Sequence, residues 1–469
     1  MMKRVATGVL RHSRLLLGVF GLLTIAGLLL IPQVHINFNL ANYVPADAAS
    51  TRATNVMAEE FDDSVPNVRV YVPNLSVVEA VEVKQQLQAI EAVETVIWLD
   101  DFIDLKQPLE VQDPDTVSGF YSNGGALFQI STSLDDAQVT MEQLQQIATP
   151  QGAVEGQLLD LAQAQSSTSE EISTIMFIMI PLALLLLVFS TRSWLDPLIL
   201  LVTIIVAVVL NMGTNIFLGE ISFLTAAVAG VLQMAVTMDY GIFLLHSRFR
   251  HLEAGAGRKG SIHAGMVESS SAVLASSTTT IFGFLALIFM RFRIGPDLGV
   301  VLAKGVVFSL ICVFFLMPAL MLQLDRAVMA TSHRPLMPSF AGLGRGIARA
   351  AKPLLLIGLL LPICFVAQGM NDFRYGNTDY PAGSREAADR EFIQAEFGRS
   401  LPMALLVPRG DWGREHQLEQ ELAALDAVSA ITSYQTQGGR LIPAEVLPED
   451  TLSSLMSSNY SRLVLTVDT

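Results

Sequence analysis

The chain has 469 residues, of which 51% are hydrophobic and only 16% are charged. A soluble domain usually carries about 25% charged residues, and here the deficit is confined to long windows with almost no charge. The composition therefore excludes a soluble globular protein and predicts an integral membrane protein. The net charge of −15 comes mainly from the soluble segments, whose acidic surface argues against nucleic acid as a partner.

Seven apolar windows are long enough for a membrane span, which needs roughly 20 residues. They cover approximately residues 15–32, 172–189, 197–214, 221–245, 273–290, 298–321 and 353–369. The first window follows four basic residues, as a signal peptide would, but its apolar core is too long and no small-x-small cleavage site follows it. We therefore expect an uncleaved N-terminal anchor.

The positions of Lys and Arg predict the orientation of these spans, because short cytoplasmic loops are rich in both. Of the 29 Lys and Arg residues, 14 lie in the N-terminus and in loops that crossing parity places on one side. Residues 33–171 lie on the other side, with 22 Asp and Glu against four Lys and Arg. Arg291 and Arg293 fall in a short outer hairpin and break the rule without reversing it. We expect a multi-pass protein of a bacterial inner membrane with a cytoplasmic N-terminus.

The soluble segment after the first window predicts alternating strands and helices. Strands are expected at 68–73, 93–99, 125–134 and weakly near "GAVEG", and helices at 76–90, 137–148 and 156–171. This order is similar to a split βαβ, or ferredoxin-like, sandwich. The fold class is therefore an α+β polytopic membrane protein with extracytoplasmic split-βαβ domains.

Parts of the sequence recur at a nearly constant offset, which predicts an internal duplication. "LQAIEAVETV" matches "LAALDAVSAI" at an offset of 335, and "GVLRHSRLLL" from Gly8 matches "GIARAAKPLL" from Gly346 at 338. The predicted parts are an anchor helix at 1–32, an extracytoplasmic domain at 33–171, a five-helix bundle at 172–325, a cytoplasmic linker at 326–352, a seventh span at 353–370 and a partial second domain at 371–469.

Asp239 is the main candidate for a functional residue, because it lies inside an apolar window together with Tyr240. Aspartate in the middle of a span costs about 2.5–3.5 kcal/mol and persists mostly where it faces a bundle interior or a water path. Arg248 lies nine residues further on, about 13 Å along a helix, so Asp239 is too deep to reach the head groups. A buried carboxylate can bind and release a proton, and the Tyr240 hydroxyl can donate a hydrogen bond to it.

Two other polar features of the spans leave alternatives open. Lys304 could be the counter-ion of Asp239, but it lies near the outer end of its window and could instead extend to the outer surface. The hydroxyls of "SSTTT" (276–280) could line a proton path or simply pack against a helix. We find no nucleotide-binding, metal-binding or hydrolase motif, so we expect no enzyme activity, no metal and no cofactor other than the proton as coupling ion.

Together these features resemble the MMPL family of the resistance-nodulation-division (RND) superfamily of transporters. The resemblance rests on the layout of one span, a large outer domain and five spans, with the unit then starting again. It also rests on "LANYVPADAAS" after the first span, on "MDYGIFLLHSRFRH" closing the fourth and on "AKGVVFSLICVFFLMPALM" in the sixth. It implies that Asp239 and Tyr240 form the proton relay of an RND-type bundle. It also implies that the outer domains are porter domains that pass lipids or other hydrophobic molecules outward.

Two further hypotheses stay open within the same superfamily: a sterol-sensing or receptor-like protein, and an accessory factor for protein translocation. The offset of 335 places Thr469 opposite Leu134, so we expect the intact polypeptide to approach 670 residues and these 469 residues not to transport alone. The expected partners are membrane lipids and a hydrophobic substrate, with either a homo-oligomer or a completing C-terminal half; the substrate itself is not predicted.

Overall fold

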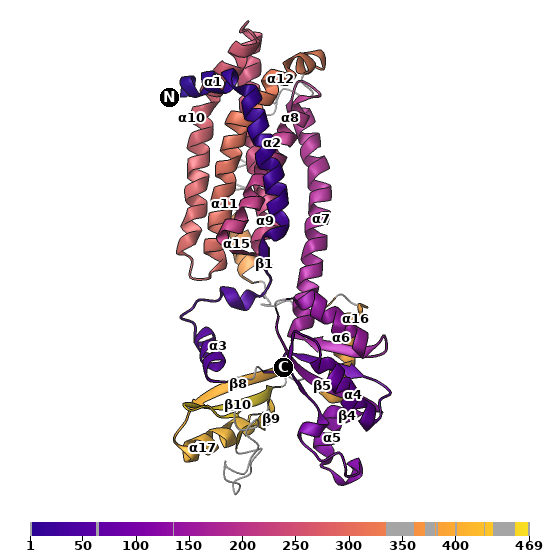
Figure 1. The fold of residues 1–469 in the computed structure, drawn as a ribbon. Helices are drawn as coiled ribbons and strands as arrows, with labels where there is room; N and C mark the ends of the chain where they lie inside the picture. The colour runs from indigo at the N-terminus through magenta and orange to yellow at the C-terminus, as the bar shows by residue number, and fades with distance from the viewer. Residues whose placement is uncertain are drawn as a thin grey trace. The chain divides into compact units, whose positions relative to one another are not determined.

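A computed structural model shows two compact units (Figure 1). The helical unit comprises Met1–Tyr43 and Thr168–Gly376, and the sheet unit comprises Val44–Ser167 and Asn377–Thr469. The structure describes residues 2–61, 65–134, 136–333, 361–370, 380, 383–398, 401–425, 427–434 and 455–467.

The helical unit is a bundle of mostly long apolar helices, with the short helices α1 and α15. Their bounds are α1 Met2–Arg11, α2 Ser13–Leu30, α7 Gln157–Ser190, α8 Asp196–Gly213, α9 Phe223–Glu253, α10 Arg258–Leu285, α11 Ile294–Ile311, α12 Met317–Ala330 and α15 Leu361–Gly369. Six helices in the described residues are long and apolar enough to span a membrane, and they confirm six of the seven predicted windows. The seventh window, 353–369, ends in α15, and its residues 353–360 lie outside the described part of the chain.

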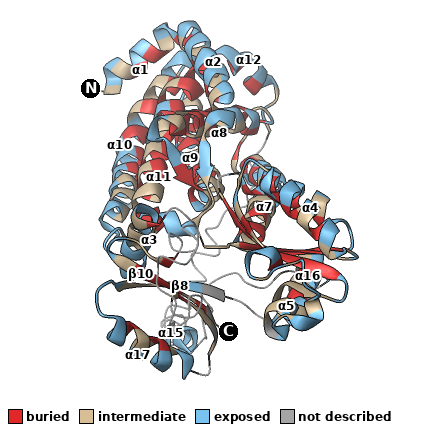
Figure 2. Ribbon diagram, turned by 60° about the horizontal axis from the view of Figure 1, so that its bottom comes forward, coloured by how far each residue is buried: buried red, intermediate tan, exposed pale blue. Residues whose placement is uncertain are grey.

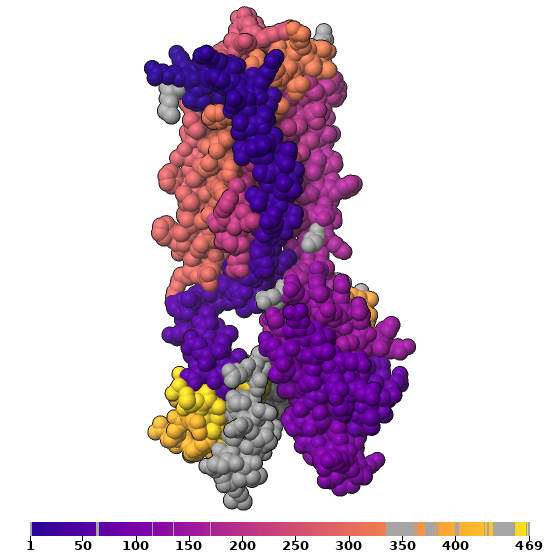
Figure 3. All heavy atoms as spheres, viewed as in Figure 1, coloured from indigo at the N-terminus to yellow at the C-terminus, as the bar shows by residue number. Residues whose placement is uncertain are grey.

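Two spans lie at the centre of the bundle, and others lie at its surface. In the spans of α8 and of α11 with α12, 61% of the most apolar window is buried, against 11% for α2, α7 and α10. α2 accordingly lies on the outside of the bundle in the space-filling view (Figure 3). α2 approaches α8 closely at Gly213, where an added Cβ would lie 2.6 Å from the carbonyl oxygen of Gly27.

A short ribbon and a helix cap fix the start of α9. Strand β1, His35–Asn37, pairs in parallel with β7, Glu220–Ser222, directly before α9. The Ser222 hydroxyl caps the helix by accepting from the backbone N–H of Thr225 at 3.1 Å. Asp297 of α11 accepts from the Ser222 N–H at 2.8 Å and from the Thr225 hydroxyl at 2.5 Å. These contacts set the register of α9 against α11.

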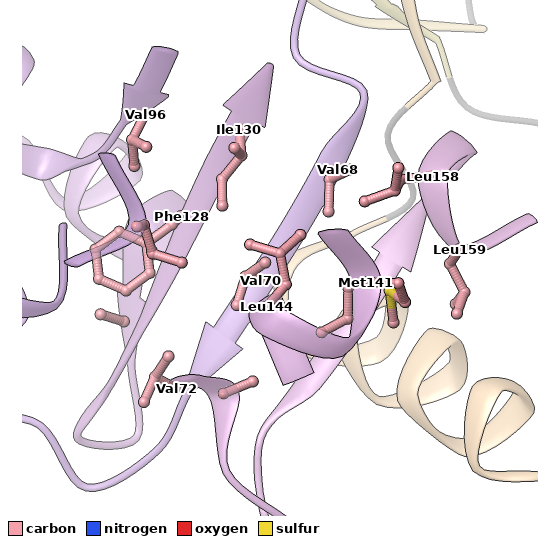
Figure 4. Close-up of a cluster of buried hydrophobic side chains, with 14 of the residues drawn as sticks. Val68, Val70, Val72, Val96, Phe128, Ile130, Met141, Leu144, Leu158 and Leu159 are labelled. Atoms are coloured by element: carbon pink, nitrogen blue, oxygen red, sulfur yellow. The ribbon is translucent and has the colours of Figure 1, made fainter. Parts of the chain in front are cut away.

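The first sheet of the sheet unit has five strands and confirms the predicted strand positions. Its strands are β2 Val68–Val72, β3 Val93–Ile97, β4 Tyr121–Ser122, β5 Gly125–Thr132 and β6 Ala153–Gly156. The order is β3-β5-β2-β6, with β4 paired to β5, and every pairing is antiparallel. Buried residues follow these strands (Figure 2). Hydrophobic side chains of β2, β3 and β5 pack against those of α6 and the start of α7 (Figure 4).

The helices beside this sheet match the prediction in part. α4 (Val77–Gln88), α6 (Ala137–Ala148) and the start of α7 lie where helices were expected. α3 (Ala49–Glu60) and α5 (Pro114–Phe120) were not predicted. The Ser76 hydroxyl accepts from the N–H of Glu79 to begin α4, in a capping box.

The second sheet repeats three strands of the first. Its strands are β8 Leu401–Pro408, β9 Val428–Thr432 and β10 Tyr460–Val467, in the antiparallel order β8-β10-β9. α17 spans Trp412–Ala423 and corresponds to α4 at an offset of 335 residues. The same offset relates β9 to β3 and β10 to β5, so the described strands of the second copy repeat the order of the first.

The two copies exchange a helix. α16, Arg385–Phe397, belongs to the second copy but packs on the first sheet, where the Val154 N–H donates to Asp389 at 3.3 Å. The ring of Phe392 lies 4.9 Å from that of Tyr71. The side chain of Asn123 donates to Glu396 at 2.5 Å.

The reciprocal contacts join α3 of the first copy to the second sheet (Figure 1). The side chain of Asn459 donates to Glu60 at the end of α3 at 2.7 Å. The guanidinium of Arg462 lies 5.0 Å from the ring centre of Phe61. An offset of 336, one more than that of the strands, relates Asn123 to Asn459 and Glu60 to Glu396. Each copy therefore uses the same Glu–Asn contact on the other copy's sheet.

Candidate functional site

Asp239 and Tyr240 lie side by side in α9 but face different surroundings. The Tyr240 side chain is buried in a cluster that includes Leu200, Leu244 and Met317. Asp239 is exposed on a different face of the helix. It belongs to one exposed stripe along α9, which consists of Leu224, Val228, Ala235, Asp239, Phe243, His246 and Arg250. The carboxylate therefore faces outward from this bundle rather than into its core.

The expected hydrogen bond from Tyr240 to Asp239 does not occur among the described residues. The Tyr240 hydroxyl is buried and makes no hydrogen bond of regular geometry there. It faces Thr280 of α10, and the charge of Asp239 acts on it only through space. The side chains of Asp239 and Tyr240 point in different directions because successive residues of an α-helix are about 100° apart.

Lys304 pairs with α8 rather than with Asp239. Its ammonium donates to the backbone carbonyl of Asn211 at 3.1 Å and to the side-chain oxygen of Asn215 at 2.6 Å. The Asn211 carbonyl is in the last turn of α8, where backbone carbonyls lack a partner within the helix and a cation is favourable. Lys304 thus caps α8. Its predicted place near the outer end of its own window agrees with a partner at the end of α8.

A buried hydrogen-bond network extends from this cap between α8, α9 and α11. The Asn211 side chain donates to Gln233 at 3.0 Å, and Gln233 donates to the carbonyls of Ala207 and Gly305 at 2.9 and 3.0 Å. The hydroxyls of Thr237 and Ser309 lie 2.7 Å apart.

Sequence reasoning missed this network, although a signal was present. Asn211, Gln233 and Lys304 are polar side chains inside otherwise apolar windows, as Asp239 is. Gly305 makes the close approach possible, since an added Cβ would lie 2.8 Å from the Asn211 amide nitrogen. Asn211 and Gln233 are buried, Lys304 is half-buried, and their hydrogen bonds join α8, α9 and α11.

The hydroxyls of residues 276–280 mostly bond their own helix. Thr278, Thr279 and Thr280 each donate to the carbonyl four residues earlier in α10, at 2.7, 3.2 and 3.1 Å. Such bonds satisfy a hydroxyl within its own helix and need no partner helix. Thr280 alone of these three is also placed beside Tyr240.

A charged cluster closes the bundle at the end of α9. Arg248 is fully buried and donates to Asp325 of α12 at 2.5 Å. The guanidinium of Arg258, from α10, lies 3.1 Å from the other oxygen of Asp325. Asp196, at the start of α8, is also fully buried and is influenced by the charge of Arg248. A buried pair of this kind is strongly destabilising to break, so the cluster fixes how four helices meet.

The fold and these sites define a helical polytopic membrane protein with β-sheets outside its helical bundle and with charged side chains in its spans. The chain belongs to the MMPL family of membrane transporters, within the RND superfamily: the sequence profile of the "MMPL family" matches residues 42–353. Members of this family are transporters rather than enzymes. Asp239, Tyr240 and Lys304 all lie within the matched range.

Three curated proteins are similar to parts of the chain. A protein of Methanocaldococcus jannaschii described as a membrane protein is 30% identical over 151 residues, covering 32% of this chain and 39% of that protein. A membrane protein of Streptomyces coelicolor is 27% identical over 303 residues, covering 61% and 41%. The siderophore exporter MmpL5 of Mycobacterium tuberculosis is 23% identical over 372 residues, covering 72% and 38%. The chain thus spans about two fifths of the length of these relatives.

Among solved structures, a heavy metal efflux pump has a TM-score of 0.41 at 14% identity, covering 57% of this chain and 36% of that chain.

Proposed function

We propose that this chain forms part of a proton-driven exporter of lipids or other hydrophobic molecules in a bacterial inner membrane. The observation that supports the proposal is the position of Asp239, a carboxylate within a span that faces outward from the bundle core. The other charge considered in the spans, Lys304, already has two protein partners. Of the two, Asp239 is the charge that faces outward, and we assign proton exchange to it.

The energetics of the site are suited to coupling. A carboxylate against lipid costs about 2.5–3.5 kcal/mol, so the exposed face of α9 should adjoin a water path or another polar segment. A proton that crosses the membrane through such a path releases about 2.3 kcal/mol per 100 mV. That free energy is sufficient to shift the balance between two packings of a helical bundle.

The family and one relative support the proposed substrate class. MmpL5 of Mycobacterium tuberculosis is named as a siderophore exporter, and a siderophore is one of several substrates open to this chain. In this proposal the sheet unit lies outside the cytoplasm and passes the substrate outward. Reporter fusions at about residue 115 should behave as exported and fusions at about residue 255 as cytoplasmic; the opposite pattern would overturn the orientation.

Export of a hydrophobic dye tests the transport itself. Bacteria that produce the natural gene product should extrude Nile red faster than cells without it, and a protonophore should abolish the difference. A receptor-like member of the superfamily would give no dye extrusion in either condition. Extrusion that continues after the protonophore collapses the proton gradient would refute proton coupling while leaving transport intact.

A further inference from the structure

A cleft of about 470 Å³ lies in the helical unit between the end of α7 and the last turns of α9. Phe189, Ser190, Thr191 and Arg192 line it from α7 and the residues after it, and Ile242, Phe243, His246, Phe249 and Arg250 line it from α9. A volume of this size has room for roughly fifteen waters at about 30 Å³ each. The charged and imidazole groups along its wall make it a place where water can be held.

The cleft continues the exposed stripe of α9 that carries Asp239. His246 follows Asp239 by seven residues, which is almost two helical turns and about 10.5 Å along the axis. Both side chains are exposed on the same face of the helix, with Phe243 between them. Asp239 thus lies above a cleft that begins one turn further on, in the direction of the predicted cytoplasmic loop.

The hydrogen bond of His246 fixes which ring nitrogen can accept a proton. Its Nε2 lies 2.9 Å from the backbone carbonyl oxygen of Ser190. A carbonyl only accepts, so Nε2 carries the hydrogen and donates, and the neutral ring keeps its lone pair on Nδ1. Histidine is the side chain that most readily gains and loses a proton between pH 5 and 8.

The charged groups around His246 come from both walls of the cleft. Arg192 forms an ion pair with Glu253, and Arg250 forms one with Glu268 at 3.1 Å. Both carboxylates are substantially exposed, and exposed pairs of this kind contribute only about 0–1 kcal/mol. Each arginine is thus balanced by a carboxylate, and the ring of His246 stays exposed beside them.

We propose that His246 is the proton-exit group for Asp239. The neutral Asp239 carboxyl gives its proton to water in the cleft and becomes a carboxylate. Nδ1 of His246 accepts a proton from that water, and the imidazolium then releases one proton to the cytoplasm. No electron moves and no other bond changes. The inference rests on the proposed function and adds a second residue to its proton path.

Chemical rescue tests the role of the imidazole directly. The protein as its source organism makes it is reconstituted in liposomes, and Nile red transport driven by an imposed proton gradient is measured with imidazole added on the cytoplasmic side. We expect His246→Ala to slow transport about tenfold or more and imidazole to restore much of the rate. His246→Gln keeps a donor towards Ser190 but has no base, so it should stay slow at every pH between 6 and 8.

His251 offers a matched control on the same helix. It pairs with Glu268 at 2.8 Å and does not line the cleft, so His251→Ala should transport normally and ignore imidazole. Wild-type rates in His246→Gln, or no response of His246→Ala to imidazole, would overturn the exit role. If Asp239→Asn still abolishes transport in that case, only this inference fails; if Asp239→Asn also transports normally, the proposed function fails first.

Discussion

Asp239 and Lys304 are both charged residues in predicted spans, yet their surroundings in the structure differ. Lys304 donates to one oxygen of α8 and one of the residues directly after it, and it joins a buried network with Asn211 and Gln233. Asp239 lies on an exposed stripe of α9 and directs its carboxylate away from the core. A charge whose hydrogen bonds are met by the protein stabilises one packing, whereas a charge left facing outward can change its protonation state. We therefore assign a structural role to Lys304 and proton exchange to Asp239.

The largest expected effect is on transport, from Asp239→Asn. The amide has nearly the shape of the carboxyl group but cannot bind and release a proton, so dye transport should fall by about 100-fold or more. The thermal unfolding midpoint should stay close to that of the wild type, because Asp239 makes no core contact. Asp239→Glu is the control and should keep partial transport. An Asn variant that transports normally would remove Asp239 from the mechanism.

Lys304→Met should instead affect stability. It leaves the fully buried side-chain oxygen of Asn215 without its donor, which costs about 1–3 kcal/mol. Chemical unfolding in detergent measures the loss. The double variant Lys304→Met with Asn215→Leu removes both partners and should recover most of it. If Lys304→Met abolishes transport without changing stability, the distinction between the two charges is wrong.

Gly305→Ala probes the same network by overpacking it. The added Cβ would lie 2.8 Å from the Asn211 amide nitrogen and 3.2 Å from the Gln233 side-chain oxygen, so we expect a loss of about 1–2 kcal/mol in unfolding free energy. Gly21→Ala in α2 is the matched control, since an added Cβ there meets nothing within 4 Å. Equal effects of the two substitutions would show that the network does not set the packing of α11.

Tyr240→Phe should have the smallest effect. The hydroxyl makes no regular hydrogen bond in the described structure, and its ring packing is unchanged by the substitution. We expect transport to fall by about twofold, equivalent to roughly 0.5 kcal/mol. Transport rates of the purified variant measure this. A loss as large as that of Asp239→Asn would mean that Tyr240 and Asp239 act as one unit after all.

The sequence predicted those parts of the fold that depend on local pattern. Short runs of β-favouring residues predicted β2 and β5, hydropathy predicted six spans, and the offset of 335 predicted that the second copy repeats the strands of the first. These features follow from neighbouring residues or from direct self-comparison.

The helix exchange and the polar network could not be predicted in the same way. α3 and α16 look the same whichever sheet they cover, and the contact from Glu396 to Asn123 spans 273 residues. The facing of Asp239 and Tyr240 depends on the rotation of α9, which is fixed by contacts such as those of Asp297 with Ser222. A charged residue in an apolar window therefore indicates a site, but the sequence alone does not predict whether that residue caps a helix or exchanges a proton.

Infrared difference spectroscopy of the purified protein between two pH values tests the role of Asp239 most directly, because the difference between wild type and Asp239→Asn isolates one carboxyl group among the 44 Asp and Glu residues. The account predicts one component of the protonated carboxyl band that grows as the pH falls and is missing from the Asp239→Asn variant, while Lys304→Met retains it. The same pH-dependent band in wild type and Asp239→Asn would contradict the claim that Asp239 exchanges the proton.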